Sequence, residues 1–156
     1  MLKIIFIVYT LPFFFVIEAE AMSLLGIGKT CVFSEVQLHI MQDGKPLQNV
    51  TVTRQWEWNK SAQDVSNTDA KGYVSFPAVY ESSVSRLLPT ELVVGQQLSV
   101  TVNGEEHVIW TNAKRKPEEN SEYGGQPFIA ECELTNEEKL IEDFGSLMVT
   151  ICKLKG

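Results

Sequence analysis

The most constraining feature of this sequence is a pair of alternating segments joined by Asn103-Gly104. Apolar side chains stand at every second position on both sides of this dipeptide, at Leu98, Val100, Val102, Val108 and Trp110. Alternation of period two is typical of a half-buried strand, and Asn-Gly between two such strands is the strongest short hairpin signal. The sequence therefore predicts a β-hairpin over residues 97–111.

Further short strands are predicted along the rest of the chain. They cover residues 36–41, 50–58, 73–76, 128–134 and 147–152, and turn-forming residues 43–46 and 68–72 lie between some of them. In the last strand, Leu147, Val149 and Ile151 are expected to face inward. Residues 80–90 could form one or two helical turns. The pattern predicts an all-β fold, an antiparallel, immunoglobulin-like sandwich of about seven strands.

The N-terminal segment has the layout of a secretory signal. Lys3 precedes an apolar stretch from Ile4 to Ile17, and Ala19-Glu20-Ala21 offers small residues at a cleavage site. We expect residues 1–21 to be a signal peptide and 22–156 to be one periplasmic domain without a membrane span. An uncleaved anchor is one alternative. Translation from Met22, which would give a cytoplasmic protein, is another.

Export would place the three cysteines, Cys31, Cys132 and Cys152, where disulfides persist. Three thiols allow one bridge and leave one thiol over. A bridge between Cys31 and Cys152 is favoured because it would tie the two ends of the mature chain together. Pairing of Cys132 with either of the others stays open.

Charge and motif content argue against several classes of function. The net charge of −7 disfavours non-specific binding of nucleic acid, which needs clustered positive charge. The two histidines, His39 and His107, lie far apart and match no zinc-ligand spacing. A nucleophile-elbow motif and a glycine-rich phosphate loop are both lacking. We therefore expect no enzymatic activity, metal or cofactor.

Three segments are candidate surfaces for binding another protein. Arg54, Trp56 and Trp58 share one face of a strand, although the tryptophans could instead fill the core. The loop over residues 114–125 is long and polar, and it is either a binding loop or a solvated connector. Its candidate contact residues are Lys114, Arg115, Lys116 and Tyr123. Arg86 is the third candidate.

Residues 43–47 and 68–79 resemble transthyretin-like and carboxypeptidase-regulatory-like sandwiches, which usually serve as structural or binding modules. The chain from Met22 also resembles a family of small exported bacterial proteins, through residues 31–36, 54–58, 80–89 and 144–150. Proteins of this type often resemble neutralising partners of secreted toxins. The resemblance implies an immunity protein against an antibacterial effector. A structural or carbohydrate-binding module of the cell envelope is the alternative.

Overall fold

The computed structural model describes residues 29–82 and 91–155. The predicted signal segment, residues 83–90 of the possible helical turns, and Arg86 lie outside the described residues. The described elements are β1 (Lys29–Phe33), β2 (Val36–Gln42), β3 (Lys45–Pro46), β4 (Thr51–Glu57), β5 (Ser61–Asn67), β6 (Tyr73–Phe76), β7 (Val79–Ser82), β8 (Val94–Val102), β9 (Glu105–Lys114), the 3-10 helix η3 (Ser121–Tyr123), β10 (Phe128–Glu133), β11 (Lys139–Ile141), β12 (Met148–Thr150) and β13 (Cys152–Leu154).

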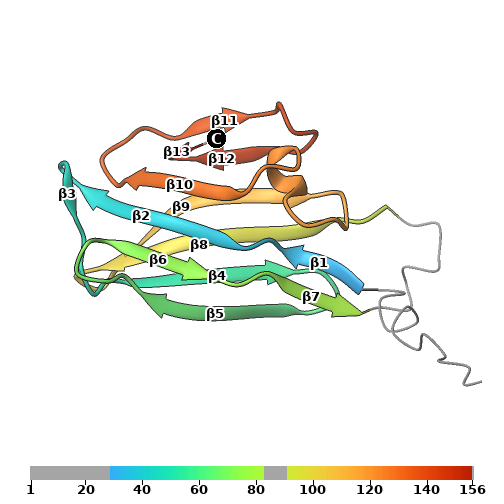
Figure 1. The fold of residues 1–156 in the computed structure, drawn as a ribbon, viewed down its shortest axis with the longest axis horizontal. Coiled ribbons are helices and arrows are strands. Elements are labelled where there is room, and N and C mark those ends of the chain that lie inside the picture. The colour runs from blue at the N-terminus through green and yellow to red at the C-terminus, as the bar shows by residue number, and fades with distance from the viewer. Residues whose placement is uncertain (1–28, 83–90, 156) are drawn as a thin grey trace, which may run out of the picture.

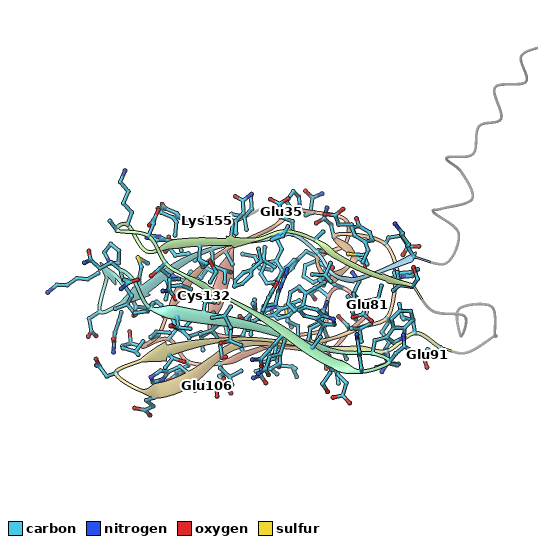
Figure 2. The ribbon with its side chains drawn as sticks, turned by 90° about the horizontal axis from the view of Figure 1, so that it is seen from below. Glu35, Glu81, Glu91, Glu106, Cys132 and Lys155 are labelled. Atoms are coloured by element: carbon cyan, nitrogen blue, oxygen red, sulfur yellow. A yellow bond between two sulfur atoms is a disulfide. The ribbon has the colours of Figure 1, made fainter. Side chains whose placement is uncertain are left out.

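The strands form a sandwich-like all-β fold, as the alternating pattern predicts. One layer is a six-stranded sheet in the order β11-β12-β9-β8-β4-β5. The other contains β13, β10 and β2, with β3 and β6 both paired to β2, while β1 and β7 form a short two-stranded sheet that continues this layer (Figure 1). In Figure 2, Glu35 and Lys155 lie on the outer side of this second layer, and Glu106 lies on the opposite side of the molecule.

Alternate side chains of the strands meet between the layers and form the core. Val36, Leu38 and Ile40 of β2 are all buried, as are Val52 of β4 and Leu98 of β8. Burying one such aliphatic side chain contributes about 1.5–3 kcal/mol. The period-two pattern of β2 thus places its apolar side inward and leaves Gln37 and His39 on the outer surface.

The predicted hairpin is confirmed as β8 and β9, with Asn103 and Gly104 at positive φ in the turn. The expected facing of Val108 is wrong. The register shifts between Leu98 and Ser99, so that Leu98 faces Trp110 and Ser99 faces Val108, with Ile109 as the extra residue. This bulge buries both Ile109 and Trp110 and leaves Val108 exposed.

The predicted last strand is two strands that belong to different layers. β12 pairs with β9, β13 pairs with β10, and the chain crosses between the layers at Ile151. The amide of Ile151 donates a 3.1 Å hydrogen bond to the carbonyl of Ile109. The bulge in β9 therefore provides the acceptor for the segment that crosses between the layers. Met148 and Thr150 face inward and Leu147 is exposed, the reverse of the expected facing for that end of the strand.

One strand pair departs from the antiparallel expectation. β10 runs parallel to β2 over six residue pairs, from Phe128 opposite Val36 to Glu133 opposite Met41. A parallel pair requires a long connection, and here the whole six-stranded sheet apart from β11 and β12 lies between the two strands in sequence. Alternation within one strand carries no information about such a partner.

The disulfide joins Cys132 to Cys152, not Cys31 to Cys152 as expected. These two residues face each other directly in the antiparallel pair of β10 and β13. Cys31 lies in β1, opposite Tyr80 of β7, and its buried thiol is not bridged. The prediction that a disulfide joins the two ends of the chain was wrong, because the strand that carries Cys152 pairs with β10 and not with β1.

Helices of the part of the chain that the structure describes are too short to span a membrane.

Candidate functional site

Arg54, which is predicted as a contact residue, is fully buried in the sandwich. Its Nε donates to Asp64 at 2.9 Å, a second nitrogen bonds the other oxygen of the same carboxylate, and a third donates to the carbonyl of Pro77 at 2.7 Å. The guanidinium also lies over the rings of Phe33, Trp56 and Phe76. Arg54 therefore joins β4, β5 and the β6–β7 connection inside the fold and offers no accessible surface.

The two tryptophans of this strand end are only slightly accessible. Trp56 is buried, and its Nε1 donates a 2.7 Å hydrogen bond to Glu81 of β7. Trp58 is half-buried and packs against the core. The alternative in which the tryptophans contribute to the core therefore describes this segment better than an exposed contact patch.

A second buried charge centre organises the predicted binding loop. The Nζ of Lys114 donates to the Glu122 carboxylate at 2.7 Å, to the hydroxyl of Ser121 at 2.8 Å and to the carbonyl of Glu118 at 2.8 Å. Both Lys114 and Glu122 are buried. An ammonium has three donor hydrogens, and all three are used here. Lys114 thus holds the loop from inside and is not a surface contact.

Other polar groups complete the environment of the Glu122 carboxylate. Ser34 donates its hydroxyl to Glu122 at 2.6 Å and its amide at 3.2 Å, and Gln96 donates at 2.9 Å. Gln96 in turn accepts a 2.9 Å bond from Asn112. The Glu122 carboxylate on η3 is thereby hydrogen-bonded to Gln96 of β8, to Lys114 of β9 and to Ser34, which follows β1. Tyr123, also predicted as a contact residue, is buried edge-on against Phe128.

This buried cluster contains a thiol, a hydroxyl, a carboxylate and an amine, but its geometry does not favour nucleophilic chemistry. Burial raises the pKa of the Cys31 thiol, despite the opposing influence of Lys114. A thiolate is the reactive form of cysteine, so a raised pKa lowers reactivity. The hydroxyl of Ser34 donates to Glu122 and accepts from the amide of Asn120 at 2.7 Å. The cluster acts as a structural anchor for the loop.

We expect acid to destabilise the fold through this anchor. Burial would raise the pKa of Glu122, but Lys114, Ser34 and Gln96 together hold it below the usual 4.5. A carboxyl whose pKa is lowered on folding stabilises the protein above 4.5, and this stabilisation is lost as pH falls through the folded-state value. Urea unfolding at neutral pH and well below pH 4.5 measures the loss. Glu122→Gln should flatten this pH dependence, and an unchanged dependence would contradict the assignment to Glu122.

Two predicted loop residues, Arg115 and Lys116, are exposed. The guanidinium of Arg115 bonds Glu91 at 2.6 Å, and both side chains are exposed to solvent. Such pairs contribute little to stability. The structure thus separates the basic run into one buried anchor and two solvated residues.

An accessible, hollowed surface lies on the outer side of β6, β2 and β10. Two hollows of about 430 Å³ and 320 Å³ meet there, and both are lined by Glu35 and Gln37. We call this surface the β2 face and define it by Glu35, Gln37, Tyr73, Ser75, Glu119 and Ile129. It combines carboxylates with two exposed apolar groups, since Tyr73 is 51% and Ile129 37% exposed.

Local turn chemistry positions the aromatic group of this face. The carboxylate of Asp69 accepts from the amides of Lys71 at 2.8 Å and Tyr73 at 2.9 Å. Gly72 has a φ of +80°, and a side chain there would meet the carbonyl of Ile40 at 2.7 Å. The predicted turn at 68–72 is thus confirmed, and it fixes the start of β6 so that Tyr73 projects outward.

A row of interacting side chains crosses the same surface. Tyr73 stacks on His39 with ring centroids 4.3 Å apart, and His39 Nε2 lies 3.0 Å from the carbonyl of Lys71. Nδ1 of His39 faces Glu131 at 3.7 Å, and Lys155 bonds Glu131 at 2.9 Å. The Lys155 ammonium accordingly lowers the pKa of Glu131. The stacked His39 ring covers one side of the Tyr73 ring, and the other contacts hold His39 in place.

The residues of the β2 face form no recognisable motif in the sequence. Gln37 and His39 read only as the polar half of a strand, and Glu35 precedes it. A usable signal was Tyr73, an aromatic residue on the polar side of the alternation Tyr73, Val74, Ser75, Phe76. Strand β10 adds Ile129 to the β2 face only because it pairs in parallel with β2. The position of Tyr73 in the sequence does not reveal this pairing.

Among the described residues, no cluster of histidine, cysteine or carboxylate side chains could hold a metal ion. The arrangement of the β2 face suits contact with another molecule through aromatic, aliphatic and acidic groups.

Comparison with known proteins identifies a family for this chain. A family model described as a domain of unknown function (DUF6795) covers residues 36–137. No curated protein and no solved structure matches the chain. The resemblances to transthyretin-like sandwiches and to exported bacterial proteins stay predictions. Since the matched span runs from the first residue of β2 to beyond β10 and covers most of the chain, the protein belongs to the DUF6795 family.

Proposed function

We propose that this protein is an exported binding module that binds another protein through the β2 face, and more specifically that it is an immunity protein neutralising a secreted antibacterial effector. The observation that carries the proposal is the meeting of two hollows at Glu35 and Gln37. Exposed Tyr73 lies in one hollow and exposed Ile129 in the other.

The chemistry of the β2 face suits a protein partner with a basic surface. Tyrosine is enriched among residues that dominate binding energy, and a ring already supported by His39 loses little freedom on binding. Glu35 and Glu119 add negative charge beside the apolar groups. Opposite charge on a partner raises the association rate and disfavours acidic competitors. The net charge of −7 acts in the same direction.

Export is part of the proposal and has two supports. The N-terminal residues have the composition of a secretory signal. The bond between Cys132 and Cys152 is of a kind that persists in oxidising compartments such as the periplasm. An immunity protein located there would meet an incoming effector at its site of action.

The alternative of a carbohydrate-binding module has weaker support from this geometry. Sugar rings bind on exposed aromatic faces, but Trp56 and Trp110 are buried. Tyr73 already stacks on His39 with one side of its ring. A platform of exposed tryptophans, which would have favoured glycans, is therefore lacking in the described part of the chain.

We expect Tyr73→Ala combined with Glu35→Lys to abolish retention of the partner in affinity capture from envelope extracts. Truncating an aromatic anchor typically costs about 2 kcal/mol or more, or about 30-fold in Kd, and charge reversal slows association further. Glu105→Lys is the matched control, because Glu105 is exposed at the start of β9, away from the β2 face. A protein held by wild type and Glu105→Lys but absent from the double variant is the partner.

The immunity role has its own test. The captured protein is expressed with an export signal, with and without the mature domain, and growth is followed. Growth arrest that wild type relieves and the double variant does not supports the proposal. Equal retention by all three proteins would contradict the β2 face as the binding surface. Normal growth without the domain would contradict the immunity role and leave a binding module of another kind.

A further inference from the structure

Strand β5 forms one edge of the six-stranded sheet, and among the described strands it is hydrogen-bonded to β4 alone (Figure 1). All seven of its residues pair with β4 in an unbroken register. At one end Thr68 donates its amide to Val50, and at the other Trp58 donates to Lys60. In this register the even-numbered residues bond β4, so Gln63, Val65 and Asn67 direct their backbone N–H and C=O groups away from the sheet.

The other described edges carry features that oppose strand addition. β11 has three residues and includes Lys139, and β3 is only Lys45–Pro46. β13 contains Lys153, β6 has four residues and is followed by Pro77, and β7 has only four residues. The amide of Cys31 in β1 is bonded to Pro117 of the loop. Short length, lysine, proline and covering segments are the usual means by which proteins protect sheet edges.

Within residues 29–82 and 91–155, β5 has none of these protections. Its sequence is Ser-Ala-Gln-Asp-Val-Ser-Asn, without lysine, proline or bulge. The outward side chains are Ser61, Gln63, Val65 and Asn67, and Val65 is 54% exposed. The only charged residue of β5, Asp64, is bound by two of the three nitrogens of buried Arg54 and is thereby neutralised. Although the chain as a whole is acidic, this edge presents little net charge to a second acidic chain.

The strand is also complementary to itself about a two-fold axis at Val65. An antiparallel pair centred there places Val65 against Val65 and Gln63 against Asn67 of the second copy. These are the residues whose backbone groups point outward, so the free donors and acceptors match. A pair centred on Asp64 would instead oppose two carboxylates, which is unfavourable. The Val65-centred register joins apolar to apolar and amide to amide.

We propose that β5 is a homodimerisation edge, on which a second copy of this chain adds its own β5 to make one continuous sheet. The inference does not rest on the proposed function. It has a consequence for the β2 face, since Ser66 and Asn67 line the larger hollow. A second copy paired at β5 would border that hollow and place two β2 faces in one particle.

Sedimentation equilibrium of the full mature chain from micromolar to millimolar concentration tests the proposal. Wild type should show a reversible dimer. Val65→Lys should weaken it by at least about tenfold, because two like charges would oppose each other at the axis. Val108→Lys is the control, since Val108 is 41% exposed but lies in β9, an interior strand of the same sheet, and this variant should dimerise as wild type does.

A second measurement locates the contact. Val65→Cys should be cross-linked to a dimer by a short bifunctional maleimide, whereas Val108→Cys should not. A wild-type chain that stays monomeric at all concentrations overturns the proposal. Dimers of equal strength in Val65→Lys and Val108→Lys also overturn it, because they would place the contact on another surface.

Discussion

Replacing Glu122 with glutamine is expected to lower the free energy of unfolding by about 3–5 kcal/mol. The substitution keeps the shape of the side chain but removes the charge opposite Lys114, whose ammonium is buried. An unpaired buried charge is far more costly than the pair itself. Chemical denaturation at neutral pH, followed by tryptophan fluorescence, measures the change.

Two variants show whether loss of charge balance is the cause. Lys114→Met combined with Glu122→Leu removes both charges and should lose less stability than Glu122→Gln does, although Ser34 and Gln96 then lack an acceptor. Glu118→Gln removes an exposed carboxylate from the same loop and should change stability by only about 0.5 kcal/mol. If the double variant were the least stable of the three, the anchor would not act through charge pairing.

Reduction of the bond between Cys132 and Cys152 is expected to lower the free energy of unfolding by about 3 kcal/mol. The bridge closes a loop with a sequence separation of 20, which limits the conformations of the unfolded chain. Denaturation of wild type with and without a reductant measures the effect. The comparison leaves every side chain in place, so cavity formation does not contribute.

Cysteine variants distinguish this pairing from the alternatives. Cys31→Ala should keep the full effect of the reductant, and Cys132→Ala combined with Cys152→Ala should show none. Peptide mapping without reduction should recover residues around Cys132 linked to residues around Cys152. Loss of the reductant effect in Cys31→Ala would contradict the bridge described here.

Local patterns predicted the parts of the fold that depend on neighbouring residues. Asn103-Gly104 forms the turn between β8 and β9, and the turn at 68–72 forms as expected. The inward series Val36, Leu38 and Ile40 of β2 was also readable, because the period of a strand fixes which side chains share a side. All-β class and the sandwich arrangement follow from repeating this pattern.

Lys114 was predicted as a surface residue, although the alternation of strand β9 extends to it. The run Lys114-Arg115-Lys116 reads as a solvated basic loop, but strand β9 continues to Lys114. Trp110, Asn112 and Lys114 are two residues apart and all face inward. The alternation therefore contained the signal for a buried lysine. Its counter-charge, Glu122, lies after a loop and could not be inferred from the same pattern.

Long-range pairings were the part that sequence alone could not supply. The β2 face requires β10 to lie beside β2 in parallel, and the disulfide requires β13 to lie beside β10. Neither relation leaves a periodic trace in the chain. The bulge at Ile109 also could not be predicted from local sequence. Its carbonyl accepts hydrogen bonds from the segment that crosses between the layers, some forty residues later in the chain.

The pairing of β10 with β2 has a consequence for how the protein would bear a mechanical load. Tension between the N-terminal side of β2 and the C-terminal end passes through the Cys132–Cys152 bridge directly into β10, so residues 133–151 carry none of it. Because β2 and β10 are parallel, the force then pulls them past each other along their length. Their hydrogen bonds are loaded together and not broken one after another, so the strand pair at the centre of the β2 face would be the last part of this layer to yield.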